Sequence, residues 1–563
     1  MTWLMRDQEI SSCVHRLTLR RSTEFSGDLR DTSPEVQRRI REARAWRQEV
    51  IRSLSASESD VVRPTNESET LSALARGARY IIQPQLPIDP LGHRTSAPHV
   101  LVLAERYENR FLYSPLFIRN AEVVVANASR QLAHSDLQSL DPSQPEIRIG
   151  VAPRPSVTAH GLALVHSLEV LLALGHVDPL WRGALVDRRG DAWWFSLLGD
   201  EFPRFNREAY LEHYRERAAV LDAYENWRRE GGEFPTRPRW HRACDSCEFA
   251  SRCRTELEQR DDVSLVRFTD FSQQQLLRSY GVTTRTQLAA LDPKQVVSAR
   301  DEPGLVRRRA AGPEEMLSPE LDKLDELIYR ARVSIDGTYM LIGPAADVHC
   351  PTADVEVDID MESYNDVTYL WGAAVRHSPI VTGVEAGYRA FVSFESLTSE
   401  IEAKVFSEFW SWFSGLRTQV LAQGLTFAAY CFWAHAEESA MNRAVDFQTE
   451  DGPTRQDIDE FRRGSPSQWI DIYAVFKDQI QTDGPLGLKV VAGKAGFSWR
   501  DEAPGGEASM VWYEAAVSDD PGIAVAARTR LLAYNEDDCL ATRFLRDWLN
   551  TEARTLPSRD APR

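Results

Sequence analysis

The sequence predicts an α/β multidomain protein. Its 563 residues exceed the length of one ordinary domain. A hydrophobic share of 43% is typical of chains that fold around a core. Short β-prone runs alternate with apolar helical segments, and a new pattern of this kind starts near residue 341. We therefore expect two α/β domains, residues 1–261 and 341–563, joined by a helical connector at 262–340.

The first domain begins with a predicted amphipathic helix. Residues 30–55 place apolar side chains at helical spacing on a charged background, which predicts an exposed helix. Within residues 78–126, β-prone runs are separated by glycine, proline and asparagine, which predicts a small sheet. Two more helices are expected at 160–176 and 207–230.

The connector contains a predicted helix, a glycine-containing turn and a second helix within residues 270–293. Thr283 or Thr284 can cap the second helix. This unit resembles the helix-hairpin-helix motif, which grips the DNA backbone through turn amides and a helix N-terminus. A plain helical linker explains the pattern equally well, and both interpretations stay open.

The last domain places carboxylates where they can converge. In the predicted strand hairpin 355–375, acids occupy alternate positions and so share one face, namely Glu356, Asp358, Asp360 and Glu362. Residues 425–443 predict a buried strand that runs into a helix, with Glu437 and Glu438 near the helix start. Asp471 lies among apolar residues.

Near the C-terminus, residues 531–549 predict an amphipathic helix. Tyr534 and Asp538 are four residues apart on it, and they therefore share a face. An exposed edge strand would give the same alternation of acids as residues 356–362, so the further acids and this tyrosine add weight to a common site.

Three cysteines form the array C-x2-C-x5-C at Cys244, Cys247 and Cys253. Clustered thiolates in a cytosolic protein are more often metal ligands than disulfides. Zinc or a 4Fe–4S cluster would need a fourth ligand, for which Cys13 and His241 are the candidates.

This array and the early cysteine resemble those of the iron–sulfur RecB-type nucleases, whose nuclease domain has a restriction-endonuclease-like α/β fold. The resemblance implies that Cys13, Cys244, Cys247 and Cys253 hold a 4Fe–4S cluster, with zinc as the alternative. The implied role of the cluster is structural, because it ties residue 13 to residue 244 across a long loop.

The same domain lacks the residues that its family uses for cleavage. A PD-(D/E)xK site needs two metal-binding carboxylates and a lysine, and the first lysine of this chain is Lys294. Pro98-His99 stands where the family has Pro-Asp, and Phe117-Ile118-Arg119 where it has (D/E)-x-K. Ala163 and Ser167 align with its later Gln and Tyr. We expect an inactive domain that can still bind DNA or a partner, although an unconventional endonuclease site is a further hypothesis.

The carboxylates of the last domain resemble the DEDDy (DnaQ-type) exonucleases, which have a ribonuclease H-like fold. The motif D-x-E matches Asp360 and Glu362, and Y-x3-D matches Tyr534 and Asp538. The second motif normally has Asp. Glu437 is favoured here over Glu438, and Asp471 is either the alternative or a residue that supports the metal ligands from behind. The resemblance implies two Mg²⁺ or Mn²⁺ ions held by Asp360, Glu362, Glu437 and Asp538. Lys489 is either a phosphate contact or a surface lysine.

The charge of −18 is unevenly divided. Residues 341–563 hold 19 basic and 35 acidic residues, a net −16, whereas residues 1–340 are near neutral with 47 and 49. The acidity therefore lies mostly in the domain expected to bind metal ions. Fusion of the two nuclease folds resembles a bacterial RecB-like family and implies a 3′–5′ exonuclease in DNA repair or processing, with a helicase as partner.

Single-stranded DNA is the expected substrate, and RNA stays open. A non-catalytic scaffold, with both nuclease folds degenerate, is the alternative. The apolar runs fall short of the roughly 20 residues that span a bilayer, and no signal peptide is evident. We therefore expect a cytoplasmic protein without a membrane partner.

Overall fold

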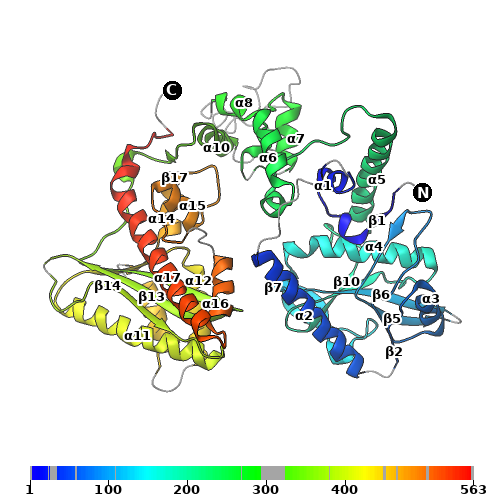
Figure 1. Cartoon of the computed structure of the whole chain (residues 1–563), viewed down its shortest axis with the longest axis horizontal. Helices are drawn as coiled ribbons and strands as arrows, with labels where there is room; N and C mark the ends of the chain where they lie inside the picture. The colour runs from blue at the N-terminus through cyan, green and yellow to red at the C-terminus, as the bar shows by residue number, and fades with distance from the viewer. Residues whose placement is uncertain are drawn as a thin grey trace. The chain divides into compact units, whose positions relative to one another are not determined.

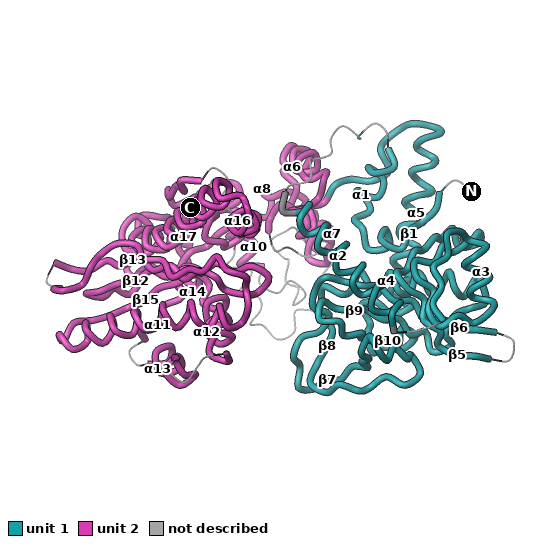
Figure 2. Tube along the Cα trace, turned by 60° about the horizontal axis from the view of Figure 1, so that its bottom comes forward, with its two compact units in different colours: residues 1–238 teal, residues 239–563 magenta. Residues whose placement is uncertain are grey.

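The computed structural model describes residues 3–22, 25, 34–57, 60–107, 110–267, 269, 271–292, 324–379, 381–447, 452–464, 467–501 and 506–559. The chain forms two compact units, residues 1–238 and 239–563 (Figure 2). The connector helices before and after residue 262 belong to the second unit. The division into three domains stays a prediction.

An eight-stranded sheet forms the centre of unit 1. In spatial order its strands are β2 (Val61–Val62), β3 (Tyr80–Ile82), β5 (Val100–Tyr107), β6 (Arg110–Ile118), β9 (Arg182–Val186), β10 (Asp191–Ser196), β7 (Val124–Asp136) and β8 (Glu146–Pro153). The sheet predicted over residues 78–126 is confirmed as part of it. β6 and β9 run parallel, and β5 pairs antiparallel with β6. A separate short pair joins β1 (Met5–Arg6) and β4 (Arg94–Thr95).

Two helices cover opposite faces of this sheet (Figure 1). The predicted amphipathic helix is α2 (Pro34–Ser57), and its buried Val50, Ile51 and Leu54 share a core with Ile118. The next side chain toward the N-terminus of β6, Phe117, points to the other core, which α4 (Thr158–Leu174) fills. Within the described residues of unit 1, the other α-helices are α1 (Val14–Leu19), α3 (Glu67–Arg76) and α5 (Arg207–Glu230).

One helical stretch, Pro155–Leu174, is long and apolar enough to cross a membrane by length and composition alone. The sequence expectation that no stretch reaches this length is therefore corrected. However, 67% of its apolar window is buried inside the protein. A helix that is apolar all round is also typical of a core, where it is covered on every side. Helix α4 fits that position between the sheet and α5.

The first part of unit 2 is helical, with α6 (Ala250–Gln259), α7 (Phe271–Ser279), α8 (Arg285–Ala290) and α10 (Leu324–Asp336). The predicted helix–turn–helix is confirmed as α7 and α8. Gly281 lies in the turn with φ +82°, a conformation that favours glycine. The Thr284 side chain caps α8 by accepting from the Gln287 amide. The connector residues 293–323 lie outside the described residues.

The second part of unit 2 is a five-stranded sheet with the order β14 (Gly387–Val392), β13 (Val367–His377), β12 (Val355–Tyr364), β15 (Phe427–Cys431) and β16 (Trp469–Asp471). The first three strands are antiparallel, and β15 and β16 run parallel to β12. A two-stranded pair joins β11 (Met340–Leu341) and β17 (Ile480–Gln481). The predicted hairpin 355–375 is confirmed.

The two faces of β12 differ in chemistry. Val355, Val357 and Ile359 pack into the core under α11 (Ser399–Ala422). The intervening acids point to the other face, where α17 (Pro521–Asn550) lies (Figure 1). The other helices are α12 (His435–Val445), α13 (Arg455–Arg463), α14 (Ile472–Gln479), α15 (Leu488–Ala495) and α16 (Gly506–Ala516).

Candidate active site

Three carboxylates meet between β12 and α17. Asp360 and Glu362 extend from β12 and Asp538 from α17, and one oxygen of each lies within 4.8 Å of the others. The two strand acids share a face because they are two residues apart. A β-bulge follows at once, since Tyr369 is an extra residue on β13 between the partners of Glu362 and Ser363.

Glu362 and Asp538 are buried and Asp360 is half-buried, and because the three carboxylates lie close together, each charge disfavours the others. Burial raises the pKa of Asp360 well above its ordinary value, and the charges of Asp538 and Glu362 add to the rise. Burial, with the Asp538 charge, raises the pKa of Glu362 to about 8. Burial also raises the pKa of Asp538, although Lys489 opposes the rise.

Polar neighbours fix the orientation of the two aspartates. Lys489 forms an ion pair with one oxygen of Asp538, and the Trp499 indole N–H donates to the other at 2.7 Å. The Asn535 amide donates to Asp360 at 2.8 Å. The Tyr388 hydroxyl in turn donates to Asn535 at 2.7 Å. The orientation of both carboxylates is therefore set before any ligand binds.

Gly372 makes the contact of Asn535 possible. It lies opposite Asp360 in the β12–β13 register. A Cβ atom at this position would come within 1.7 Å of the Asn535 side-chain oxygen. The approach of α17 to the sheet therefore requires glycine here.

Tyr534 lies beside Asp538, one helical turn earlier. It is 2% exposed, and its hydroxyl is near enough to the Asp538 carboxylate for each group to change the pKa of the other. The Lys489 ammonium is 4.5 Å from the centre of its ring, and Trp512 contacts the ring edge-on at 5.3 Å. Burial and the Asp538 charge raise the pKa of this hydroxyl, so it stays protonated at neutral pH.

Glu437 is buried near the three carboxylates but is not one of the group within 4.8 Å. Its Oε2 atom has no hydrogen-bond partner among the described residues. Burial, with the charges of Asp471 and Glu438, raises its pKa to about 8. Its charge also contributes to the raised pKa of Asp360, which indicates that the two are neighbours.

The two alternatives to Glu437 have other partners. Glu438 accepts from the Trp469 indole at 3.1 Å and lies 3.8 Å from Arg462. Asp471 caps α14 by accepting from the Tyr473 amide at 2.9 Å. Its same oxygen accepts from the Trp433 amide at 3.0 Å. These contacts give both carboxylates structural roles and favour Glu437.

Trp433 was not singled out by the sequence analysis. It follows β15 and is 53% exposed, with φ +72°. A bulky side chain in this left-handed region is a rare, strained arrangement, and such strain concentrates at functional sites. Since Tyr430 is opposite Asp358, the chain beyond β15 runs beside Asp360. The tryptophan in CFWAH, directly after an apolar strand, is the signal that could have pointed to it.

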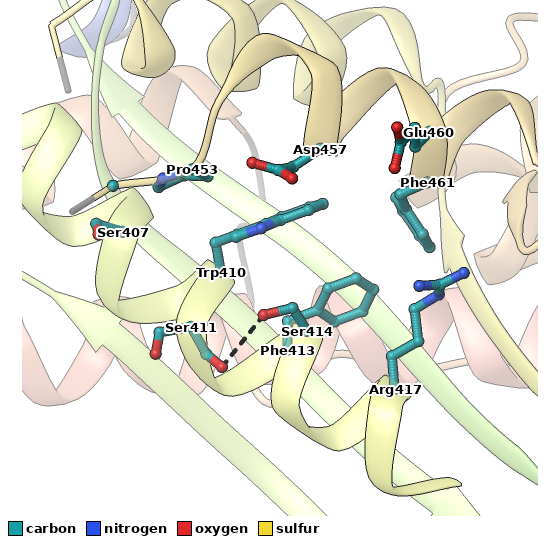
Figure 3. Close-up of a pocket in the computed structure, with 11 residues that line it drawn as sticks. Ser407, Trp410, Ser411, Phe413, Ser414, Arg417, Pro453, Asp457, Glu460 and Phe461 are labelled. Atoms are coloured by element: carbon teal, nitrogen blue, oxygen red, sulfur yellow. Dashed lines mark hydrogen bonds between the residues drawn. The ribbon is translucent and has the colours of Figure 1, made fainter. Parts of the chain in front are cut away.

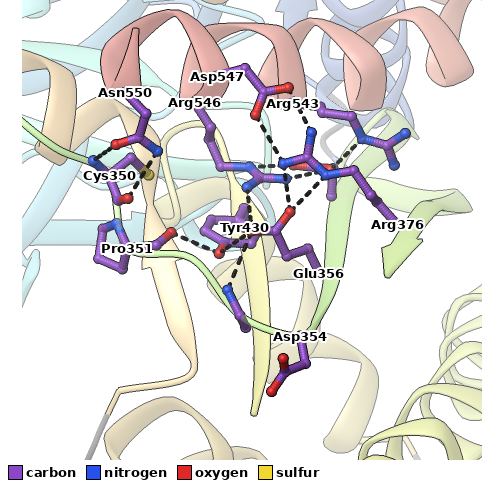
Figure 4. A network of polar contacts seen from close by, with 12 residues as sticks. Cys350, Pro351, Asp354, Glu356, Arg376, Tyr430, Arg543, Arg546, Asp547 and Asn550 are labelled. Atoms are coloured by element: carbon purple, nitrogen blue, oxygen red, sulfur yellow. Dashed lines mark hydrogen bonds and ion pairs between the residues drawn. The ribbon is translucent and has the colours of Figure 1, made fainter. Parts of the chain in front are cut away.

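The acids Glu356 and Asp358, on the same face of β12, are paired with arginines. Figure 4 shows Glu356 beside Arg376 and Arg546. Arg546 is fully buried and donates twice to Asp358, at 2.9 and 3.0 Å. Arg543 adds a third contact to Asp358 at 3.1 Å. Arg376 bridges Glu356 and Asp547, with contacts of 2.6 Å to each.

The carboxylates fit a divalent metal centre. Among the described residues, Lys489 is the cation that pairs with this group, through Asp538. The group itself consists of Asp360, Glu362 and Asp538. Glu437 supplies a further buried oxygen without a partner. Hard carboxylate oxygens are the ligands that Mg²⁺ and Mn²⁺ prefer. The excess negative charge and the donor type both match such ions.

A pocket of about 450 Å³ lies elsewhere, between α11 and α13 (Figure 3). Trp410, Phe413 and Phe461 line it together with serines of α11. It is on the α11 side of the sheet, and none of the three carboxylates lines it. The chemistry therefore belongs to the α17 side.

The four predicted cluster cysteines are divided between the units. Cys13 precedes α1 in unit 1, whereas Cys244, Cys247 and Cys253 belong to unit 2. Within unit 2 the array folds as a 3₁₀ turn followed by α6, and Cys244 is buried. His241, the alternative ligand, precedes that turn. The iron–sulfur cluster stays a prediction.

Residues 419–550 match the family model described as RNase H superfamily. The matched range runs from α11 to the end of α17 and includes Glu437, Tyr534 and Asp538. The search of curated proteins gave no match. The search of solved structures gave none either. The chain therefore contains an RNase H-like domain, a class that typically hydrolyses phosphodiester bonds of nucleic acids with divalent metal ions.

Proposed function

We propose that the protein is a metal-dependent 3′–5′ exonuclease that acts on single-stranded DNA in the cytoplasm. The convergence of Asp360, Glu362 and Asp538, whose nearest oxygens lie within 4.8 Å of one another, is the observation that carries the proposal. A structural ion-pair network would place arginines around these acids, as happens at Glu356 and Asp358. Here, among the described residues, Lys489 is the cation that pairs with the three carboxylates, and the buried Glu437 lies beside them.

Asp360, Glu362, Glu437 and Asp538 would hold two Mg²⁺ or Mn²⁺ ions, which when bound activate the attacking water and stabilise the leaving oxygen. The residues of the chain then position the reactants. Asn535 keeps Asp360 oriented, and Trp499 keeps Asp538 oriented. The protonated Tyr534 hydroxyl can donate to, and so orient, a water beside Asp538. Lys489 can contact a substrate phosphate once its partner Asp538 is engaged elsewhere.

A stacking side chain at the edge of the site supports a nucleic-acid substrate with unpaired bases. Trp433 is 53% exposed, and Asp471 holds its backbone. Bases of single strands stack on such exposed aromatic rings without strong sequence preference. Polarity, like the choice of DNA over RNA, follows the resemblance to DEDDy exonucleases.

Unit 1 is proposed to hold or guide the DNA without cleaving it. The residues that align with the family's cleavage motifs, Pro98-His99 and Arg119, bring no carboxylate to the end of β6. A 4Fe–4S cluster on Cys13, Cys244, Cys247 and Cys253 belongs to this proposal, as does a helicase partner. Iron and sulfide content of the anaerobically purified protein, against the variant C247S, tests the cluster.

The double variant D360A/D538A tests the activity. We expect it to lose at least about a thousandfold in the rate of 3′-end trimming with Mn²⁺ while it stays folded. E438Q is the matched control, because Glu438 contacts Trp469 and Arg462 and should keep activity. Full activity in the double variant would contradict the assignment. An inactive wild-type protein that binds DNA would favour the scaffold alternative.

A further inference from the structure

Four basic or imidazole side chains lie near one another where β5 begins and β6 ends, since Arg47 and His160 both lower the pKa of His99 and Arg119 lowers that of His160. His99 directly precedes β5, Arg119 directly follows β6, and His160 lies in the first turn of α4. Arg47 comes from the middle of α2. We call these four residues the arginine–histidine cluster. Each is partly exposed, so a ligand can reach the cluster from solvent.

Hydrogen bonds define how His99 is presented. The Ile118 backbone N–H donates to His99 Nδ1 at 2.8 Å, so Nδ1 carries no proton and Nε2 is the donor. The His99 ring contacts Phe117 at 5.3 Å, and the Arg119 amide donates to Val186 at 2.8 Å. The ends of β5 and β6 therefore hold His99 and Arg119 side by side.

Several polar atoms of the cluster have no partner in the part of the chain that the structure describes. They are Arg47 Nε, Arg119 Nη1 and His160 Nδ1, all of them buried atoms. No described carboxylate forms an ion pair with either arginine. Unpaired buried donors are costly, and such groups in a native structure require an explanation.

The electrostatics of the cluster favour an anion over a cation. Burial lowers the pKa of His99 to about 3, and Arg47 and His160 add to the effect. Burial likewise lowers the pKa of His160 to about 4, with a contribution from Arg119. Both imidazoles are therefore neutral, and the two arginines supply the charge. The N-terminus of α4, which has no side-chain cap, adds a positive dipole end.

We propose that the arginine–histidine cluster is a binding site for a backbone phosphate of a nucleic-acid strand. Unpaired guanidinium groups and N–H donors are the chemistry that recognises a phosphate. The cluster lies where the family resemblance predicts metal-binding carboxylates and a lysine. The charge at this position is therefore positive, whereas the carboxylates would make it negative. The proposal deepens the proposed role of unit 1 in holding DNA.

Binding of a labelled single-stranded oligonucleotide to the full chain in EDTA tests this site without hydrolysis. R119A and R47A should each weaken binding about tenfold, because a charged hydrogen bond to phosphate is lost. Each should also lower the slope of log affinity against log salt by about 0.7, the value for one phosphate contact on a single strand. R130A, which removes an exposed arginine from β7, is the matched control and should change neither.

Two further variants separate charge from packing. R119K should retain most of the affinity and R119Q should lose it; if R119A does not fold, these variants and R47A give the answer. Unchanged affinity and slope in folded R47A and R119A would overturn the proposal. Arg119-dependent binding of inorganic phosphate, with oligonucleotide affinity unchanged, would also overturn it by showing a site for a free anion.

The activity assay keeps the two proposals distinct. An Arg119-dependent salt slope in a protein that cleaves nothing would remove the exonuclease and leave the phosphate site. If the wild-type protein cleaves and the R47A and R119A variants bind normally, the phosphate site is wrong and the exonuclease proposal stands.

Discussion

Glu356 and Asp358 lie on the same face of β12 as Asp360 and Glu362, under the same helix α17. The first pair is surrounded by Arg376, Arg543 and Arg546, in contacts of 2.6 to 3.1 Å. The second pair meets a third carboxylate, Asp538, which forms an ion pair with Lys489. We call these the closed half and the open half of the face.

The difference shows how identical side chains acquire different roles. In the closed half, burial opposes ionisation of Glu356, but Arg546 and Arg376 outweigh it and lower its pKa. In the open half, burial and like charges raise the pKa of Asp360 and Glu362. A paired buried carboxylate is structural, whereas an unpaired group of them is poised for a cation. The predictions below test this contrast.

The largest effect on stability is expected for R546M in the closed half. Arg546 is fully buried and pairs with both Asp358 and Glu356. Its removal takes two hydrogen bonds from the buried Asp358 and an ion pair from Glu356, leaving Asp358 with Arg543 and Glu356 with Arg376, and this costs about 3–5 kcal/mol. Denaturant unfolding measures the loss. A change below about 1 kcal/mol would mean that this half is not held by its ion pairs.

In the open half, the variant D538N should stabilise the metal-free protein, whereas R546M destabilises it in the closed half. It removes one of three repelling carboxylates while keeping an oxygen for the Trp499 indole. We expect the metal-free protein to gain about 1 kcal/mol in stability. The stabilisation by Mn²⁺ should disappear along with the activity. A metal-free D538N protein that unfolds as easily as R546M would contradict the distinction between the halves.

Neutralising Glu437 by the variant E437Q should weaken metal binding. E437Q keeps the shape of the side chain but removes the charge of its unpartnered oxygen. We expect the Mn²⁺ concentration that gives half-maximal cleavage to rise about 10- to 100-fold. E438Q is again the control. Equal effects of E437Q and E438Q would contradict Glu437 as the fourth metal ligand. Asp471 would then be the candidate, and D471N would test it.

Stability without metal should depend on pH through the open half. The pKa of both Glu362 and Glu437 is raised to about 8 from an ordinary 4.5. Between these values the folded state binds more protons than the unfolded state, so stability falls as pH rises from about 4.5 to 8. Mn²⁺ should offset the loss, and its stabilising effect should therefore increase with pH. Thermal unfolding with EDTA and with Mn²⁺ from pH 5 to about 8.5 measures both; a metal effect independent of pH would contradict it.

The smallest effect is expected for W433A. Loss of one stacked base costs about 1–3 kcal/mol, so binding of single-stranded DNA should weaken by about tenfold. The rate at saturating substrate should change little, since Trp433 lies outside the carboxylate group. W433F should restore much of the affinity. An equal loss of rate and affinity would give Trp433 a role in the chemistry itself.

The sequence predicted the face of β12 correctly because alternation in VEVDIDMES has a single geometric meaning in a strand. It could not separate the closed half from the open one. Arg543 and Arg546 are more than 180 residues away in the chain, and only the packing of α17 brings them to Asp358. Asn535 and Gly372 were missed for the same reason, because their contact exists only between a helix and a strand.

The choice between Glu437, Glu438 and Asp471 also needed three dimensions. All three are acids near the end of a parallel strand, and the sequence favours Glu437 without excluding the other two. The indole of Trp469 and the amide of Tyr473 distinguish them, by occupying two of the three. A helix cap such as Asp471 is a local feature that the sequence can suggest. The burial of Glu437 depends on tertiary packing, which the sequence does not show.

Helix α17 is attached to β12 at two levels, through Arg546 in the closed half and through Asn535 in the open half. A helix fastened at two points cannot tilt away from the strand to enlarge the space between Asp360 and Asp538. If the site binds metal ions as proposed, the width of that space would select them by radius. Oxygen ligands lie about 2.0–2.1 Å from Mg²⁺ and about 2.3–2.6 Å from Ca²⁺. Calcium should consequently occupy the site in strained geometry and act as an inhibitor, and weakening the Arg546 attachment should relax this discrimination.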